Sequence, residues 1–226
     1  MITQLFKKKG RQALLGLLLL TGLSAAAQQP PFWGDIQRFK KADSLQQPAA
    51  NGILFIGSSS FTKWKDIADY FPGYPVINRG FGGSSLPDVI RYAGDIIFPY
   101  QPKQIIVYCG DNDLAAADTV TAATVVARFQ QLYQLIRSRM PGAEIDYVSI
   151  KPSPSRSRLM PKMIEANTQI RAFLRTQKHA AFIDVFTPML NKQGQPREEL
   201  FVEDRLHMNA TGYKIWQKAI QPYLKK

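Results

Sequence analysis

The chain has 226 residues, of which 45% are hydrophobic and 11% aromatic, enough to bury the core of one domain. Its formal charge is +12, from 29 Lys and Arg against 17 Asp and Glu. The basic residues are dispersed and form no zinc-finger or RNA-recognition pattern, which favours a solvated surface over nucleic-acid binding. The only cysteine, Cys109, excludes an internal disulfide and a CxxC metal or redox site.

The first 27 residues have the features of a secretory signal peptide. Basic residues at positions 7, 8, 9 and 11 precede an apolar run at 13–23, and three alanines at 25–27 fit the cleavage pattern. The alternative is a membrane anchor, but this apolar stretch is shorter than the ~20 residues that a spanning helix needs. We expect a mature chain that starts at Gln28, has a formal charge of +8 without those four basic residues, and is exported to the periplasm or secreted with no membrane span.

Strand and helix patterns alternate through residues 28–226. Short apolar runs predict strands at residues 53–56, 76–78, 104–108, 144–150 and 180–185. Apolar residues at helical spacing, with cap and stop signals, predict helices at 33–45, 86–95, 121–139 and 159–178, and a last helix capped by Asn209. This order predicts a single α/β domain, a three-layer α/β/α sandwich with a five-stranded parallel sheet. In such sheets ligands bind at the carboxyl ends of the strands.

Three consecutive serines, Ser58, Ser59 and Ser60, follow the first predicted strand, where a catalytic residue would lie. The G-x-S-x-G turn of the α/β-hydrolases would need glycine at position 61, but Phe61 is there. The sequence therefore disfavours that family.

A serine nucleophile needs a base, and the chain has two histidines. His179 stands between a predicted helix and a predicted strand, which favours a surface or helix-terminal role. His207 lies in the loop before the last helix, three residues after Asp204, which is near enough to orient its ring. Because the D-x-x-H spacing is common by chance, it supports a Ser-His-Asp site only together with other residues.

Two further loops follow strands. The glycine-rich segment "NRGFGGSS", residues 78–85, and the segment "YCGDND", residues 108–113, could both donate hydrogen bonds to an oxyanion. The first is not a dinucleotide fingerprint, because its third glycine would fall at Ser85. The second lacks the glycine that an EF-hand loop requires. Because no histidine is nearby either, a capped turn is favoured over a metal site. Flavodoxin-like cofactor binding would leave Asn112, Asp204 and His207 without a role.

The segments "FIGSSS", "NRGFGG", "GDND" and "DRLH", which follow the first, second, third and last strands, together resemble the four blocks of the SGNH hydrolases, also called GDSL esterases/lipases. The resemblance covers nearly all of residues 28–226. It implies the flavodoxin-like SGNH hydrolase fold and a serine esterase that needs no metal or cofactor. A non-catalytic binding domain on the same fold is the alternative, but it would have no need for all the catalytic positions.

The resemblance also implies the role of each site residue. It makes Ser59 the nucleophile and Asp204 and His207 the other members of a catalytic triad. The oxyanion would be held by the N–H groups of Ser59 and Gly83 and by the side-chain amide of Asn112. One departure is Ser58, which replaces the usual aspartate of the G-D-S motif; we expect it to alter hydrogen bonding in the loop more than the chemistry.

The substrate is less well defined by the sequence. Few residues remain outside the predicted core to build a lid or an acyl tunnel, which favours short acyl groups. We expect a small-molecule or glycan ester, with deacetylation of a carbohydrate ranked above a lysophospholipase or platelet-activating-factor acetylhydrolase-like activity. Arg156 and Arg158, in the loop after the fourth strand, could bind an anionic substrate or could belong to a solvated basic loop. The oligomeric state stays open.

Overall fold

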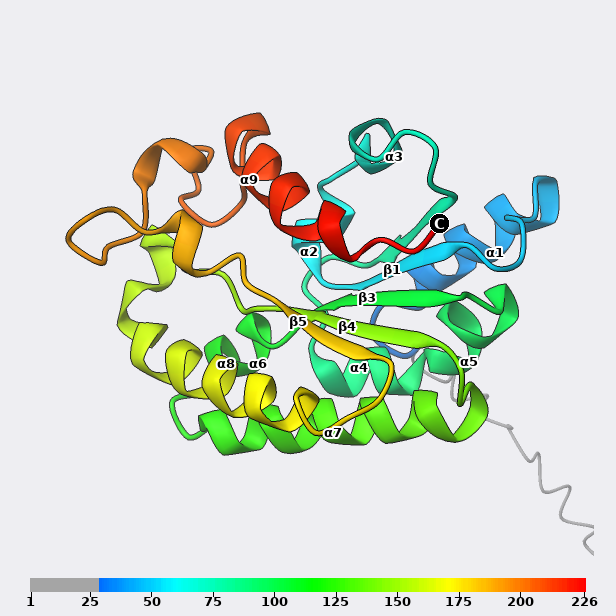
Figure 1. The fold of residues 1–226 in the computed structure, drawn as a ribbon, viewed down its shortest axis with the longest axis horizontal. Helices are drawn as coiled ribbons and strands as arrows, with labels where there is room; N and C mark the ends of the chain where they lie inside the picture. Colours follow the sequence, from blue (N-terminus) through cyan, green and yellow to red (C-terminus); the bar gives the residue numbers. More distant parts are fainter. Residues whose placement is uncertain (1–28) are drawn as a thin grey trace, which may run out of the picture. The chain divides into compact units, whose positions relative to one another are not determined.

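The computed structural model describes residues 29–226, and the predicted signal peptide, residues 1–27, lies outside them. Within the described part, five parallel strands form one sheet in the order β2-β1-β3-β4-β5 (Figure 1). The strands are β1 (Ile53–Gly57), β2 (Val76–Gly80), β3 (Gln104–Tyr108), β4 (Glu144–Val148) and β5 (Ala180–Ile183). The central strands β1 and β3 are buried along their whole length, as expected for a parallel sheet covered on both faces.

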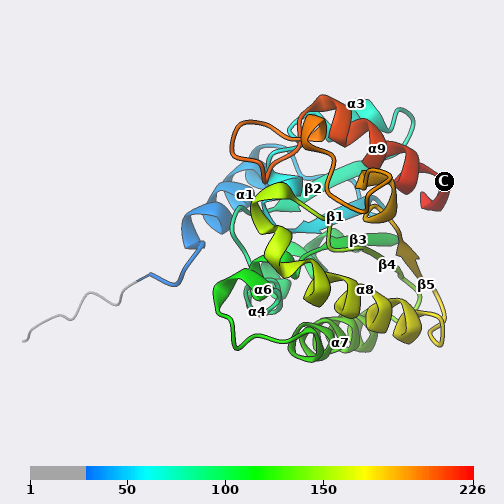
Figure 2. The same cartoon turned by 90° about the vertical axis from the view of Figure 1, so that its left-hand side faces the viewer.

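Helices cover both faces of this sheet and confirm the predicted α/β/α sandwich. One face carries α1 (Trp33–Leu45), α4 (Leu86–Arg91), α5 (Ala93–Ile96), α7 (Ala122–Arg139) and α8 (Met160–Leu174). The other carries α2 (Ser59–Thr62), α3 (Ile67–Tyr70) and α9 (Ala210–Ile220). Figure 2 shows the sheet between the layers, with α3 and α9 on one side and α7 and α8 on the other.

The helices form where apolar residues recur at helical spacing. In α7, Val125, Phe129, Leu132 and Ile136 are all fully buried, as their spacing predicts. The Thr121 side chain accepts a hydrogen bond from the N–H of Thr124 and caps the start of this helix. No helix within residues 29–226 has both the length and the apolar character needed to cross a membrane.

Two strands end two residues earlier than predicted because side chains replace the next ladder bonds. After β4, the N–H of Ile150 donates to the Asn167 side chain instead of to a neighbouring strand. After β5, the N–H of Val185 donates to Ser149 Oγ. The helix predicted at 86–95 is also interrupted, because Tyr92 leaves the helical region with a ψ of 9°. The helix predicted at 159–178 begins one residue later and ends at Leu174.

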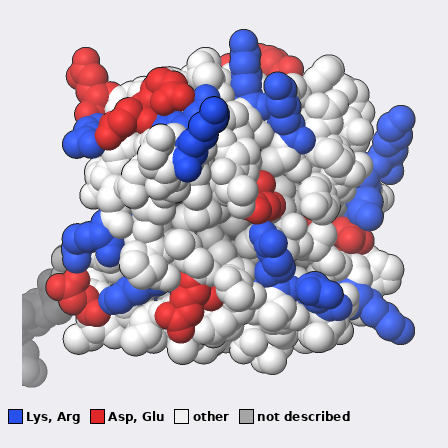
Figure 3. All heavy atoms as spheres, turned by 60° about the vertical axis from the view of Figure 1, so that its left-hand side comes forward, with Lys and Arg blue, Asp and Glu red and all other residues white. Residues whose placement is uncertain are grey.

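Charge is distributed over the surface of the molecule. On the face shown in Figure 3, Lys and Arg side chains are spread out, with Asp and Glu side chains between them. Several of these charges are paired across the chain, such as Arg171 with Asp184 and Arg158 with Asp118. This face therefore has the mixed, solvated character predicted from the sequence.

Candidate active site

The serine loop leaves the sheet through a glycine that no other residue can replace. Gly57 has a φ of 129°, and a Cβ atom there would lie 1.8 Å from the Tyr108 carbonyl oxygen on β3. The N–H of Ser58 donates to that same oxygen at 3.0 Å. This close approach turns the chain so that Ser59 becomes the first residue of the short helix α2.

The structure brings Ser59, His207 and Asp204 together although 145 or more residues separate the serine from the other two. His207 Nε2 lies 2.9 Å from Ser59 Oγ, and His207 Nδ1 lies 2.6 Å from Asp204 Oδ2. The three side chains thus form a continuous hydrogen-bonded row. Such a row can move a proton from the serine to the imidazole and stabilise the resulting cation.

A tight hairpin holds the histidine in this position. The N–H of Val202 donates to the His207 carbonyl at 2.9 Å, and Phe201 pairs with Met208 across the hairpin. Asn209 then caps α9, accepting from the N–H groups of Thr211 and Gly212. The ring therefore stands on a segment fixed at both ends.

Asp204 remains ionised in this arrangement. Partial burial opposes ionisation, but hydrogen bonds from the His207 N–H, the His207 ring and the Leu206 N–H lower the pKa of Asp204 to about 2. The carboxylate is 47% exposed, whereas the His207 side chain is 18% exposed. Asp204 can thus supply a negative charge to the ring at any ordinary pH.

Two further loops bring hydrogen-bond donors to the same end of the sheet. Gly83 has a φ of 86°, which favours glycine, and its N–H has no acceptor among the described residues. The N–H of Ser59, at the first position of α2, is also free within that part of the chain. Asn112 is the second residue of α6 (Asp111–Ala116), and its Nδ2 donates to the Ser84 carbonyl at 3.0 Å. One N–H of this amide remains available to a ligand.

The two arginines predicted to bind substrate are placed differently from each other. Arg158 is 68% exposed and pairs with Asp118. Arg156 is only 17% exposed, because its guanidinium contacts Asp111 Oδ2 and Asn112 Oδ1, both at 2.9 Å. Arg156 is thus engaged with the protein, and substrate contact by Arg158 stays a prediction.

Ser58 and Ser60, which flank Ser59, are both buried. The hydroxyl of Ser58, which stands in place of the family's aspartate, is buried without a partner in the described part of the chain. The Ser60 carbonyl accepts a hydrogen bond from the hydroxyl of Tyr213 on α9. A further anchor, which sequence reasoning missed, is Asn78: its side chain donates to the Phe61 carbonyl and ties the middle of β2 to α2. Its place at the end of the predicted strand 76–78 was the only signal for it.

The remaining candidates lie outside this row. His179 has a side chain that is 58% exposed, consistent with the predicted surface role. Asp113, considered above for metal binding, accepts from Arg128 and from the N–H of Leu86. Within residues 29–226, no three His, Cys, Asp or Glu side chains are grouped so that they could hold a metal ion.

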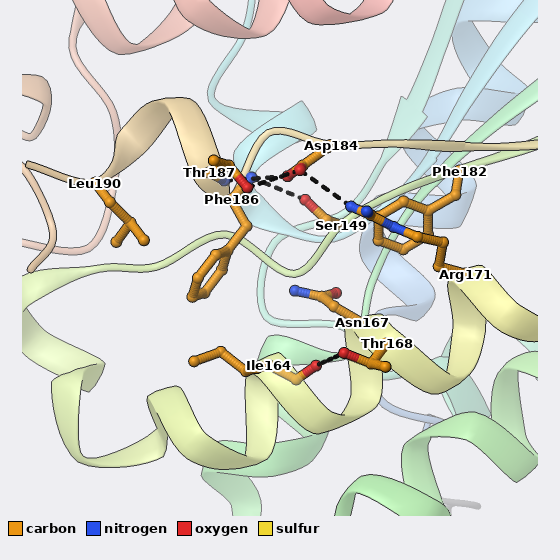
Figure 4. A pocket seen from close by; sticks show the side chains of 10 residues that line it. All are labelled: Ser149, Ile164, Asn167, Thr168, Arg171, Phe182, Asp184, Phe186, Thr187 and Leu190. Atoms are coloured by element: carbon orange, nitrogen blue, oxygen red, sulfur yellow. Dashed lines mark hydrogen bonds and ion pairs between the residues drawn. The ribbon is translucent and has the colours of Figure 1, made fainter. Parts of the chain in front are cut away.

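A separate pocket of about 330 Å³ lies between α8 and the segment after β5 (Figure 4). Its walls include Ile164, Phe182 and Phe186, and the ion pair of Arg171 with Asp184 crosses one side at 3.0 Å. None of the residues that line it belongs to the row formed by Ser59, and its charged groups are already paired. The chemistry of the molecule is therefore better assigned to the loops at Ser59.

Comparison with known proteins points to one family. The model of the GDSL-like Lipase/Acylhydrolase family matches residues 50–215, which include all four sequence blocks. No curated protein matches the chain.

Several solved structures share the fold. A protein from Streptococcus pneumonia named for platelet activating factor has a TM-score of 0.74 at 20% identity, covering 85% of this chain and 92% of its own. A GDSL-like lipase from Bacteroides thetaiotaomicron has a TM-score of 0.71 at 18% identity, covering 83% and 96%. An acetylxylan esterase from Geobacillus stearothermophilus has a TM-score of 0.61 at 13% identity, covering 77% and 94%. At these identities the likeness shows the fold alone.

Proposed function

The chain belongs to the GDSL-like Lipase/Acylhydrolase family and is an ester-bond hydrolase, and on that premise we propose that it is an exported serine esterase for short acyl groups. The observation that carries the proposal is the row from Ser59 Oγ through the His207 ring to Asp204, with contacts of 2.9 and 2.6 Å. A serine, an imidazole and a carboxylate in this order are the groups that acyl transfer to water requires.

Hydrolysis proceeds in two steps. His207 Nε2 takes the proton of Ser59 while Oγ attacks the ester carbonyl carbon, and His207 then protonates the leaving alcohol oxygen as the acyl-enzyme forms. In the second step His207 takes a proton from water, whose oxygen attacks the acyl carbon. The bond from this carbon to Ser59 Oγ then breaks, His207 returns the proton to Oγ, and the acid is released. Asp204 keeps the ring in the tautomer that can accept at Nε2 and stabilises the imidazolium.

The negative oxygen that forms in each step is held by three donors. We assign these to the N–H groups of Ser59 and Gly83, which have no acceptor within the described residues, and to the side-chain amide of Asn112. Removing one such donor typically lowers turnover by about 10²–10³-fold. The loops after β1, β2 and β3 therefore act together on one atom of the substrate.

The favoured substrate is an acetylated carbohydrate. Few residues lie outside the sandwich to enclose a long acyl chain, and an acetylxylan esterase is among the proteins that share the fold. A lysophospholipid or platelet-activating-factor-like ester is the second candidate, supported by the similarity to the protein named for platelet activating factor. Export rests on the basic and apolar pattern of residues 7–27.

Hydrolysis of p-nitrophenyl acetate, butyrate and octanoate by the mature protein tests the proposal, with Ser59→Ala as the control. Activity that falls with chain length and is lost in the variant supports a short-acyl serine esterase. Acetate release from acetylated xylan, measured against acyl release from a lysophospholipid, then separates the two candidate substrates. No Ser59-dependent activity on any ester would overturn the proposal in favour of a binding domain.

A further inference from the structure

A cluster of charged side chains, mostly buried, lies behind the predicted oxyanion site and has no role in the two steps above. Its central residue is Arg156, whose two terminal nitrogens reach different partners. Nη1 lies 2.9 Å from Asp111 Oδ2, and Nη2 donates to Asn112 Oδ1 at 2.9 Å. Asp111 also accepts, through Oδ1, from the backbone N–H of Asn112 at 3.0 Å. The guanidinium therefore contacts two side chains of the first turn of α6 directly and its backbone only through Asp111; these contacts are called the clamp below.

This clamp fixes which end of the Asn112 amide faces Arg156. A guanidinium has only donors, so the group that it contacts must be the amide oxygen and not the amide nitrogen. The Ser84 carbonyl has only acceptors, and it contacts Nδ2 on the other end of the amide. Both partners select the same orientation, which leaves one N–H of the amide for a substrate oxygen.

The clamp also connects the loops that build the site. Ser84 follows Gly83, so the bond from Asn112 to Ser84 joins two of the three predicted oxyanion donors. On the other side, the N–H of Ser155 donates to the Arg205 carbonyl at 3.1 Å, within the hairpin that holds the catalytic histidine. The segment around Arg156 thus contacts both halves of the site.

A positive charge that persists beside Asp111 requires the guanidinium of an arginine. Lys151 is 1% exposed and lies 3.7 Å from Asp111, and its burial lowers the pKa of the ammonium group. A guanidinium keeps its positive charge under the same conditions. Arg156 can therefore polarise the side-chain carbonyl of Asn112 and make the N–H groups on Nδ2 of the same amide stronger donors.

We propose that Arg156 is a positioning residue that holds the Asn112 amide with its free N–H toward the oxyanion and strengthens that donor. The inference rests on the proposed esterase function and deepens it. It gives Arg156 a role different from direct contact with an anionic substrate. Nη1 is buried and forms an ion pair with Asp111 but no hydrogen bond within the described residues, so the hydrogen bond from Nη2 to Asn112 Oδ1 carries this role.

A double-mutant cycle of Arg156→Ala and Asn112→Ala tests the proposal on p-nitrophenyl acetate. Arg156→Ala alone should lower kcat by about 10–100-fold with KM nearly unchanged, less than complete removal of an oxyanion donor. In the Asn112→Ala background the same change should cost less than about 3-fold, because residues that act through one contact are not additive. An equal loss in both backgrounds would overturn the proposal, as would a KM effect without a kcat effect.

Arg128→Ala is the matched control. Arg128 pairs with Asp113, a buried carboxylate on the same helix α6, at 2.8 Å, but it does not contact Asn112. Its loss should lower the melting temperature and leave kcat within about 2-fold, because the amide remains clamped. Arg156→Lys keeps the positive charge but lacks the two terminal nitrogens of the guanidinium, so it should recover part of the kcat lost in Arg156→Ala. If Arg156→Ala does not fold, Arg156→Lys is compared with wild type instead.

The Asn112 amide itself provides a readout that does not depend on activity. In isotope-labelled protein, its side-chain N–H resonances should be shifted and exchange faster in the Arg156 variants, but not in Arg128→Ala. An inactive wild-type enzyme that shows this pattern would refute the esterase proposal and leave the positioning role intact. An unchanged amide signal in both Arg156 variants would refute the positioning role, whatever the activity.

Discussion

Two buried aspartates in this molecule, Asp111 and Asp146, have side-chain partners of different charge. Asp111, just after β3, contacts the guanidinium of Arg156 and lies near the ammonium of Lys151. Asp146, within β4, contacts only the neutral amide of Gln104 among the side chains bonded to it, and burial raises its pKa to about 7. The difference teaches that the buried Asp111 carboxyl, where the loops meet, faces cationic side chains, whereas the buried Asp146 carboxyl inside the sheet faces a neutral amide and its ionisation is disfavoured.

The backbone differs between these two regions as well. Around Asp111, the chain keeps free N–H groups and adopts positive φ angles at Gly57, Gly83 and Gly110. Around Asp146, Gln104 is saturated: it donates to the Tyr223 carbonyl and accepts from the N–H of Lys225, which fixes the C-terminal segment against the sheet. The free N–H groups of Ser59 and Gly83 thus lie where a substrate would bind, whereas at Asp146 the atom without a partner is the carboxyl oxygen Oδ1.

The largest expected effect comes from removing the imidazole of His207, the proposed general base. His207→Gln should lower kcat by about 10⁴-fold or more, because loss of one member of a triad disables the whole unit. His179→Gln is the matched control. The His179 side chain is 58% exposed and has no proposed part in catalysis, so activity should stay within about 2-fold. Steady-state hydrolysis of p-nitrophenyl acetate measures both. Equal losses in the two variants would contradict the assignment.

A smaller effect should follow from substituting the glycine that offers an oxyanion donor. Gly83→Ala keeps the N–H but strains a backbone with a φ of 86°, so we expect about 1 kcal/mol of lost stability and about a 10-fold lower kcat. Gly73→Ala introduces the same strain, at a φ of 83° and with open space around it, away from the site. Denaturant unfolding should show similar losses for both, while only Gly83→Ala should lower kcat. A matching kcat loss in the Gly73 variant would remove Gly83 from its role.

The smallest effect on catalysis is expected at Asp146, the buried aspartate inside the sheet, where a substitution should change stability and its dependence on pH. Because the folded-state pKa of Asp146 is about 7 and its usual value is 3.8, the stability it contributes is complete below pH 3.8 and is lost as pH rises through 7. Asp146→Asn cannot ionise, so its advantage in unfolding free energy over wild type should grow between pH 4 and pH 8, up to about 4 kcal/mol as an upper limit. Urea unfolding at both pH values measures it; a constant difference would show that Asp146 does not titrate with folding.

Much of the fold could be predicted from the sequence because the strands of a parallel sheet are apolar throughout. The pattern located all five strands, and helix α7 followed directly from Val125, Phe129, Leu132 and Ile136. The ends of β4 and β5 could not be predicted, since they depend on hydrogen bonds to Asn167 and Ser149 from distant segments.

The site was predictable to the level of loops and less so to the level of side chains. Ser59, Asp204 and His207 lie together because the carboxyl ends of parallel strands meet at one edge, and the catalytic role of the three stays a prediction. The inward direction of Arg156 was missed, because a basic loop residue gives no sign in the sequence of the carboxylate and amide that it contacts. The direction in which the Arg156 side chain points is set by its packing in the folded chain.

The most direct test of the account is labelling of the mature protein with a fluorophosphonate, followed by intact mass and peptide mapping. We expect one adduct per chain, located on Ser59. It should be lost in Ser59→Ala and form much more slowly in His207→Gln, because only the serine bonded to the imidazole is activated. An adduct on Ser58 or Ser60, or labelling that persists in Ser59→Ala, would contradict it.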